Sequence, residues 1–356
     1  MPTTTRAYFQ REQDGPLELA TVTLADPRPY DVRVKLIATG VCQSQIYWMH
    51  QPRPKPLLFG HEGYGVVEAV GDAVTRVTVG DTVMVTWLPS AESAERAPGQ
   101  TLATLPDGTE AFWTNVSTWN EHTMVDEQYL VVLGPQLRDP ALALIGCAVP
   151  TGAGAVINAG AVTADDTVAV IGLGGVGLSA VAAAAAQGAA AVIAIDIADE
   201  KLAFAKRFGA THVVNSATQD AVAAVRELAR GRSGNPGVDA AVDCVGNATT
   251  ITQAVAMAAD GKVSLHRGGN AVVVGVPKTS LDLDPIQLLT KEKSLLGTLG
   301  GGCGHDQLGL FCDWTLTGTL DLAAMVTERF AFEDLPLAVE ALRKGRILGR
   351  SLVEMG

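Results

Sequence analysis

Hydrophobic and polar positions change their pattern near residue 150. Before that point, short apolar or alternating runs separated by Gly, Pro and Asp turns predict strands at residues 32–37, 65–70, 82–87 and 122–125. Residues 90–107 are polar and aperiodic, so we expect a loop there. Residues 1–150 are therefore expected to form a β-rich domain.

After residue 150, runs typical of strands alternate with helical stretches. We expect strands at residues 167–171, 191–195, 240–244 and 271–274. We expect helices at residues 178–187, 199–208, 220–231 and 249–259. This alternation predicts an α/β domain with a doubly wound parallel sheet over residues 151–298. The tail at residues 299–356, with a helix near 335–344, is expected to rejoin the first domain.

Composition narrows the class of protein. The 356 residues are 47% hydrophobic and 18% charged, which is enough apolar material for two folded domains. The formal charge is −12 without a basic run, which argues against a nucleic-acid or anionic membrane partner. Five cysteines do not suggest a disulfide framework. Residues 1–15 lack the apolar stretch of a signal peptide, and glycines interrupt the uncharged run at 167–195, so we expect a cytoplasmic protein with no membrane span.

A strand ending at residue 171 leads into the motif G-x-G-x-x-G. Gly172 permits a tight turn, Gly174 lets a pyrophosphate approach the backbone, and Gly177 lets the following helix pack on the strand. Gly175 and Val176 begin that helix, whose N–H groups and positive end suit phosphates. The motif predicts dinucleotide binding, although an isolated match can also be a glycine-rich turn.

Asp196 strengthens the prediction of a dinucleotide site. It ends the next strand, about 20 residues after the glycine motif. A carboxylate there can accept both ribose hydroxyls of an adenosine and would repel a 2′-phosphate, which favours NAD over NADP. The alternative is that Asp196 caps the helix that follows.

Cys42, His61 and Cys147 form a candidate metal site. Two thiolates and one imidazole are a known ligand set for catalytic zinc, and they leave the fourth position open for substrate. Two thiolates would also neutralise the dication. Spacing alone does not show that the three residues meet, and each could instead be a buried core residue.

The sequence resembles the zinc-dependent medium-chain alcohol dehydrogenases over nearly its whole length. The motifs that carry the resemblance are Gly40-Val-Cys42, Gly60-His-Glu-Gly63, Val79-Gly-Asp81, Gly146-Cys147, Thr151-Gly152, the glycine motif, Asp196 and Val274-Gly-Val-Pro277. The resemblance implies a β-rich catalytic domain related to the GroES fold, followed by a Rossmann domain, with zinc in the cleft between them. It implies Cys42, His61 and Cys147 as the zinc ligands.

The resemblance also implies roles for other residues. Glu62 would be a carboxylate near the metal, Ser44 would take the alcohol proton, and Thr151 would lie beside the nicotinamide. The cofactor would be held by Asp196 and Lys201 at the ribose, Arg350 at the pyrophosphate, and backbone groups near Val274 and Thr298 at the carboxamide. Trp87, Trp113 and Trp119 would line the substrate pocket, unless they are plain core residues.

The chain departs from the family pattern at three places. Residues 90–107 lack the cysteines that bind a structural zinc in many relatives, so we expect one zinc per subunit. Gln45 stands where relatives usually have Asp; its oxygen can accept the imidazole N–H but supplies no charge, and we hypothesise a more electrophilic zinc. Tyr47 replaces a relay histidine and can pass a proton, although a phenol is a weak base at neutral pH. His50 is either a substitute relay or a surface residue.

These inferences converge on a zinc-dependent, NAD(H)-linked oxidoreductase that interconverts a small-molecule alcohol and an aldehyde or ketone. Two alternatives stay open: a reductase of an activated C=C or C=N bond that does not use zinc as a Lewis acid, and a non-catalytic NAD-binding protein. By resemblance we expect a homodimer or homotetramer, paired through the edge of the Rossmann sheet near residues 271–276.

Overall fold

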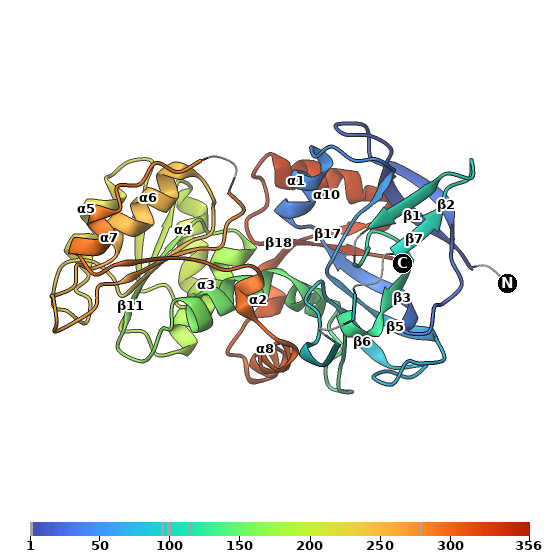
Figure 1. The fold of residues 1–356 in the computed structure, drawn as a ribbon, viewed down its shortest axis with the longest axis horizontal. Helices are drawn as coiled ribbons and strands as arrows, with labels where there is room; N and C mark the ends of the chain where they lie inside the picture. The colour runs from blue at the N-terminus through green and yellow to red at the C-terminus, as the bar shows by residue number, and fades with distance from the viewer. Residues whose placement is uncertain (1–2, 94–95, 98–100, 114, 278–279) are drawn as a thin grey trace. The chain divides into compact units, whose positions relative to one another are not determined.

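The structure is a computed structural model that describes all residues except 1–2, 94–95, 98–100, 114 and 278–279. The chain divides into two compact units (Figure 1). The first unit contains Met1–Cys147, Gly304–Leu316 and Leu322–Gly356, and the second contains Ala148–Cys303 and Thr317–Asp321. The tail of the chain thus returns to the first unit.

The first unit combines a closed barrel with a second sheet. The barrel strands follow the order β1-β2-β7-β8-β4, with bounds Thr3–Gln10, Glu18–Leu24, Thr101–Thr104, Glu110–Trp113 and Leu57–Leu58. The second sheet follows the order β10-β6-β5-β3-β18-β17, with bounds Leu130–Val132, Thr82–Val85, Gly63–Val70, Asp31–Gly40, Arg350–Glu354 and Val326–Ala331. Strand β9 (His122–Asp126) also pairs with β3. The helices are α1 (Gln43–Met49), α8 (His305–Thr317), α9 (Leu322–Met325) and α10 (Leu335–Arg343).

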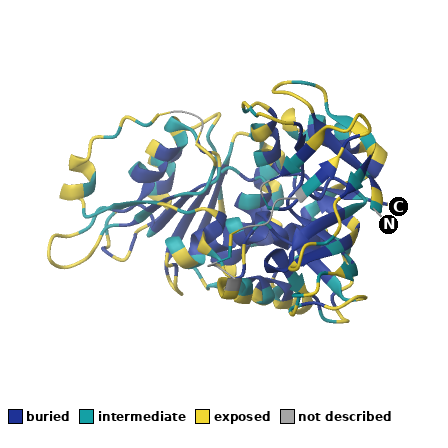
Figure 2. Ribbon diagram, turned by 45° about the vertical axis from the view of Figure 1, so that its right-hand side comes forward, coloured by how far each residue is buried: buried dark blue, intermediate teal, exposed yellow. Residues whose placement is uncertain are grey.

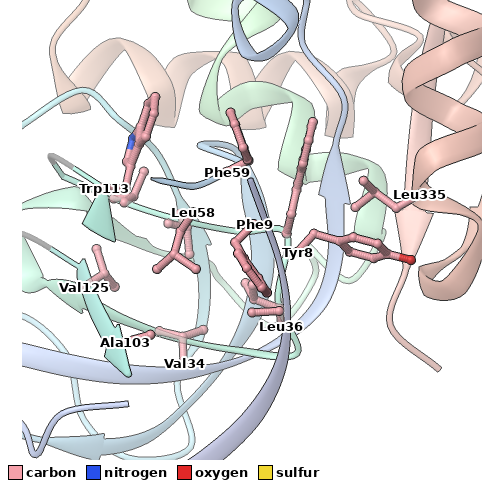
Figure 3. Close-up of a cluster of buried hydrophobic side chains, with 14 of the residues drawn as sticks. Tyr8, Phe9, Val34, Leu36, Leu58, Phe59, Ala103, Trp113, Val125 and Leu335 are labelled. Carbon is pink, nitrogen blue, oxygen red and sulfur yellow. The ribbon is translucent and has the colours of Figure 1, made fainter. Parts of the chain in front are cut away.

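Alternation along the strands builds the core of the first unit. In β3, Val32, Val34 and Leu36 are buried, whereas Lys35 and Ile37 between and after them are exposed. Burying each such apolar side chain contributes about 1.5–3 kcal/mol. Figure 3 shows Val34 and Leu36 in one cluster with aromatic and aliphatic side chains from β1, β4 and the residue after β4, including Tyr8, Phe9, Leu58 and Phe59.

The second unit is a single parallel sheet with helices. Its strand order is β13-β12-β11-β14-β15-β16, with bounds His212–Asn215, Ala191–Asp196, Thr167–Ile171, Ala240–Asp243, Asn270–Val273 and Ser294–Gly297. The helices are α2 (Ala148–Gly154), α3 (Gly175–Ala186), α4 (Asp199–Ala205), α5 (Ala221–Leu228), α6 (Ala248–Met257) and α7 (Ile286–Thr290). All residues of the central strand β11 are buried, as expected for a parallel strand covered on both faces (Figure 2). The strand order reverses between β11 and β14, and ligands of such sheets bind at the strand ends next to that point.

Most of the expected strands and helices are present, but two expectations are wrong. The expected loop at residues 90–107 contains strand β7, which pairs with β2 and β8 and belongs to the barrel. This pairing depends on backbone hydrogen bonds to distant strands, which a local polar pattern does not reveal. Residues 271–276 do not form a sheet edge either, because β15 lies between β14 and β16. The edge strand on this side of the sheet is β16, which had not been anticipated, and β13 is the edge strand on the other side.

Within the part of the chain that the structure describes, no single helix has the length and apolar character needed to cross a membrane. The segments Pro140–Gly146 and Ala148–Ala159 reach that length and hydropathy only when taken together across a bend.

Candidate metal centre and nucleotide-binding loop

Three side chains that are far apart in the sequence meet in the first unit. Cys42 directly precedes α1, His61 lies between β4 and β5, and Cys147 ends the first segment of the unit. The two sulfur atoms are 3.8 Å apart, and Nε2 of His61 is 3.1 Å from Sγ of Cys147. The three ligand atoms all lie within 4.8 Å of one another, and all three residues are buried. The structure therefore brings together the ligand set that the sequence indicated.

Glycines allow the backbone to bring these ligands together. Gly60 adopts φ +89°, a conformation that favours glycine, and a Cβ there would lie 2.4 Å from Oγ1 of Thr118. This turn presents His61 just before β5 begins at Gly63. A Cβ on Gly146 would lie 2.5 Å from the carbonyl oxygen of Val85, so the segment that carries Cys147 also depends on a missing side chain.

The two cysteines influence each other's ionisation. A hydrogen bond from the Cys147 thiol lowers the pKa of Cys42, against the effect of burial. The same contact, together with burial, raises the pKa of Cys147. The pair therefore favours one thiolate by itself, and a divalent cation would stabilise both. Two sulfurs and one imidazole nitrogen suit zinc, so the residues present fit a catalytic zinc ion with one position left for a substrate oxygen.

Glu62 and Arg350 form a buried ion pair beside this centre. Arg350 on β18 contacts Oε1 of Glu62, and both residues are buried. Burial raises the pKa of Glu62 despite the nearby guanidinium. Burial alone would lower the pKa of Arg350, but Glu62, Cys42 and Cys147 raise it, so the guanidinium stays charged. Among the described residues, Oε2 of Glu62 and Nε of Arg350 have no hydrogen-bond partner. Sequence reasoning did not foresee this pairing, because the two residues are 288 positions apart.

Helix α1 carries the other side chains expected near the metal. The Ser44 hydroxyl donates to Sγ of Cys42 at 3.3 Å. Tyr47 is half-buried, and its ring meets that of Trp48 edge to face at 5.6 Å. His50 is exposed and pairs with Asp14, as the surface interpretation expected.

Gln45 is buried on α1 and contacts two different groups. Its Oε1 accepts a hydrogen bond from the Gly60 backbone N–H at 2.7 Å. Its Nε2 lies 2.5 Å from Nδ1 of His61. The expected contact between the Gln45 oxygen and the imidazole is therefore wrong, because the oxygen faces the Gly60 N–H and the amide nitrogen faces the imidazole. The hypothesis of a more electrophilic zinc was drawn from the missing charge of Gln45, and it stays a prediction.

The three tryptophans occupy different environments. The Trp87 ring lies 6.5 Å from the His61 ring and is half-buried. Trp113 packs on Phe59 within the core cluster, as Figure 3 shows. Trp119 has no exposed surface, and its indole N–H donates to the Gly40 carbonyl at 3.2 Å. The Trp87 ring thus lies beside a metal ligand, whereas Trp113 and Trp119 both belong to the buried core cluster.

The glycine motif forms the turn between β11 and α3 in the second unit. Gly172 has φ +86°, and a Cβ on Gly177 would lie 1.8 Å from the Gly172 carbonyl oxygen. Gly174 caps α3, and nothing lies within 4 Å of a Cβ there. The protein itself needs the first and last glycines for the turn and the packing, while the middle one leaves open space of the kind that a phosphate requires.

Asp196 lies at the end of β12, close to this turn. One carboxylate oxygen accepts from the Leu173 N–H at 2.8 Å, and the other from the Ile197 and Ala198 N–H groups at 2.8 and 3.2 Å. Three of about four acceptor positions are thus used by backbone groups. The side chain thus supports the glycine turn and the bend that precedes α4. Ala198 is the N-cap of α4 and no side chain caps that helix, so the expectation that Asp196 caps it is wrong, and ribose binding stays a prediction.

The remaining cofactor candidates also lie in the second unit. Thr151 is half-buried on α2, and α2 packs closely on α3 because Gly152 leaves room for the Val176 carbonyl. Lys201 is half-buried on α4. The Val274 and Thr298 backbone N–H groups donate to Asp243 and Val273 at the ends of their strands.

Comparisons with known proteins agree with this architecture. Residues 28–135 match the family model of the alcohol dehydrogenase GroES-like domain, and residues 175–314 match that of the zinc-binding dehydrogenase. The chain is 32% identical to S-(hydroxymethyl)glutathione dehydrogenase of Synechocystis, covering 98% of this chain and 99% of that protein. It is 33% identical to the Aspergillus oryzae enzyme of the same name, over 96% and 93% of the two chains.

Solved structures are similar over the same extent. Benzyl alcohol dehydrogenase from Acinetobacter calcoaceticus has a TM-score of 0.86 and 29% identity, covering 99% of this chain and 100% of that one. An alcohol dehydrogenase zinc-binding domain protein from Burkholderia ambifaria has a TM-score of 0.90 and 28% identity over 100% of both chains. The expected combination of a GroES-like domain and a Rossmann domain is confirmed.

Proposed function

Because this chain belongs to the zinc-dependent medium-chain alcohol dehydrogenase family, we propose that Cys42, His61 and Cys147 hold the catalytic zinc of an alcohol dehydrogenase. The enzyme is an NAD(H)-linked oxidoreductase of alcohols and their carbonyl products. The observation that carries the site assignment is the convergence of the three ligand atoms within 4.8 Å. Bound zinc would supply a Lewis acid for the substrate oxygen, and bound NAD(H) would accept or donate the hydride.

Ser44 and Tyr47 are proposed to move the alcohol proton. They lie three positions apart on α1, and side chains at that spacing share a face of a helix. The Ser44 hydroxyl lies beside Cys42 and would rotate away from the sulfur to accept the proton. Tyr47 would pass it on through its hydroxyl, which can accept one proton while it donates another.

Trp87 is proposed as a wall of the substrate pocket. Its indole lies against the His61 ring, so the metal centre has one large apolar neighbour that excludes water. This environment favours an alcohol with an aromatic or other apolar group next to the hydroxyl carbon. The relatives include a benzyl alcohol dehydrogenase and an S-(hydroxymethyl)glutathione dehydrogenase, so a panel of candidate substrates should include benzyl alcohol and S-(hydroxymethyl)glutathione.

The cofactor is proposed to bind at the glycine turn of the second unit. The Gly172–Gly177 motif and the first N–H groups of α3 would hold the pyrophosphate. Asp196 would use its remaining acceptor position for the adenosine ribose, with Lys201 beside it, and Thr151, Val274 and Thr298 would surround the nicotinamide. Arg350, which the resemblance implied at the pyrophosphate, lies in the first unit, where its guanidinium pairs with Glu62.

Metal analysis tests the proposal directly. The purified protein should contain one zinc per chain, and Cys42→Ala should lose both the zinc and the NAD-linked oxidation of alcohols. Cys312→Ala is a matched control, because Cys312 is buried in α8 and is not part of the three-residue cluster. An active protein without bound metal, or a Cys42→Ala variant with undiminished turnover, would refute the assignment. The zinc-independent reductase of a C=C or C=N bond is not favoured, since the ligand set is complete.

We also propose a homodimer or a homotetramer that uses the edge strand β16. Among the residues that the structure describes, β16 pairs with β15 alone, and the nearby Leu299 is largely exposed. The mass of the purified protein in solution should be two or four times that of one chain, and a mass equal to one chain would reject this.

A further inference from the structure

The Gln45 side chain lies between two nitrogen atoms whose requirements conflict. It is buried, so water does not satisfy its amide. One end of the amide meets the Gly60 backbone N–H at 2.7 Å, and the other meets Nδ1 of His61 at 2.5 Å. The amide thus presents one atom to each neighbour, and those two atoms are an acceptor and a donor.

The backbone decides which way the amide faces. The Gly60 N–H can only donate, so the atom opposite it must be the carbonyl oxygen of Gln45. The NH₂ group therefore faces Nδ1 of His61, and Nδ1 must accept the hydrogen bond. A neutral imidazole in this arrangement carries its proton on Nε2, which is the nitrogen 3.1 Å from Sγ of Cys147.

Metal binding requires the opposite arrangement. Nε2 of His61 points into the cluster of ligand atoms, and a neutral imidazole that binds a metal through Nε2 carries its proton on Nδ1. That N–H would then face the NH₂ group of Gln45, so two donors would oppose each other. Rotating the amide by a half-turn would only move the conflict to Gly60. A carboxylate in the same place would accept from both groups.

We infer that Gln45 is a positioning residue that serves the Gly60 turn instead of the His61 imidazole, so that this centre holds zinc about 10 to 100 times more weakly than the same centre with a carboxylate at position 45. The inference rests on the proposed zinc site. It concerns how tightly that site holds its ion, not whether the site exists.

The first test replaces the amide by its isosteric acid. Holoprotein is titrated with a chromophoric chelator to obtain the zinc dissociation constant of wild type, Gln45→Glu and Gln43→Glu. Gln43 is exposed on the same helix next to Cys42, so its variant adds the same charge without touching His61. Gln45→Glu should bind zinc about 10 to 100 times more tightly, with Gln43→Glu close to wild type. Equal affinities of wild type and Gln45→Glu, or an equal gain in the control, would overturn the inference.

A second variant covers the case in which Gln45→Glu does not fold. Gln45→Leu removes both contacts while keeping a side chain of similar size. If the amide serves Gly60, the variant should keep the zinc affinity of wild type but melt at a lower temperature, because the Gly60 N–H loses its acceptor. A loss of about 10-fold or more in zinc affinity would show that Gln45 supports the imidazole, contrary to the inference. If the wild-type protein binds no zinc at all, the proposed function fails as well. If wild type and every variant bind zinc with the same high affinity, only the present inference is overturned.

Discussion

The ion pair between Glu62 and Arg350 predicts a large loss of stability when its cation is removed. Arg350 is 5% exposed and Glu62 is 0% exposed, so neither charge is screened by water. Arg350→Met keeps most of the apolar length of the side chain but leaves the Glu62 carboxylate buried without its partner. Removing one partner of a buried pair costs about 3–5 kcal/mol, a large part of a typical unfolding free energy of about 5–15 kcal/mol.

Urea unfolding in the presence of a chelator measures this change at constant metal content. The control is Arg329→Met on the adjacent strand β17, because Arg329 pairs with Glu354 but both side chains are nearly half exposed. The unfolding free energy of Arg329→Met should fall by no more than about 1 kcal/mol. The double variant Glu62→Leu/Arg350→Met should recover most of the loss, since no unpaired charge is then buried.

The sign of the pH dependence follows from the raised pKa of Glu62. Without Arg350 that pKa rises further, because a positive charge that lowers it is gone. The loss of unfolding free energy in Arg350→Met should therefore be complete well above the folded-state pKa of Glu62. It should disappear as the pH falls toward the ordinary glutamate pKa of about 4.3, where Glu62 is protonated in the folded and the unfolded state. A deficit as small as that of Arg329→Met, or one that does not change with pH, would refute the reasoning.

Three further predictions concern single positions. Gly60→Ala should lower the unfolding free energy in the urea assay by about 2–4 kcal/mol, because a positive φ and a close contact both oppose a Cβ there. The control is Gly108→Ala, where φ is also positive but the space is open, and its unfolding free energy should fall by only about 1 kcal/mol. Burial alone would raise the pKa of Asp166, but Arg232 helps to lower it. The ionised Asp166 therefore stabilises the folded protein at neutral pH, and this contribution is lost as the pH falls through the depressed pKa. Arg232→Leu should therefore cost about 1–2 kcal/mol at pH 7 and less in acid, and an equal cost at both would contradict this. Asp196→Asn should lower the ratio of kcat/KM with NADH to kcat/KM with NADPH by about 10-fold or more. An unchanged ratio would show that the Asp196 carboxylate does not select the cofactor.

Local sequence was sufficient where local structure carries the chemistry. The glycine motif lies between a fully apolar strand and a helix, and each glycine has a steric reason that can be stated without coordinates. The ligand types at Cys42, His61 and Cys147 also define the metal chemistry by themselves. The prediction that these three side chains meet, by contrast, depended on the resemblance to a known family, since spacing along the chain does not determine which residues meet.

The features that sequence reasoning missed depend on distant contacts. Strand β7 is stable because β2 and β8 pair with it, although its own residues alternate weakly. The direction of the Gln45 amide is decided by the backbone of Gly60, 15 positions away. A pattern of side chains along one segment contains no information about such partners.

The place of β18 in the sheet has a consequence for the order of folding during synthesis. This strand contains Arg350 and inserts between β3 and β17, although β3 is made more than 300 residues earlier. As the chain leaves the ribosome, the second unit is nearly complete before the first has its last strand or the counter-charge of Glu62. The part of the protein that is translated first is therefore completed last. Until β18 is made, the end of β3 at Ala38–Gly40 lacks the strand that pairs with it, although β9 can already pair with the first half of β3.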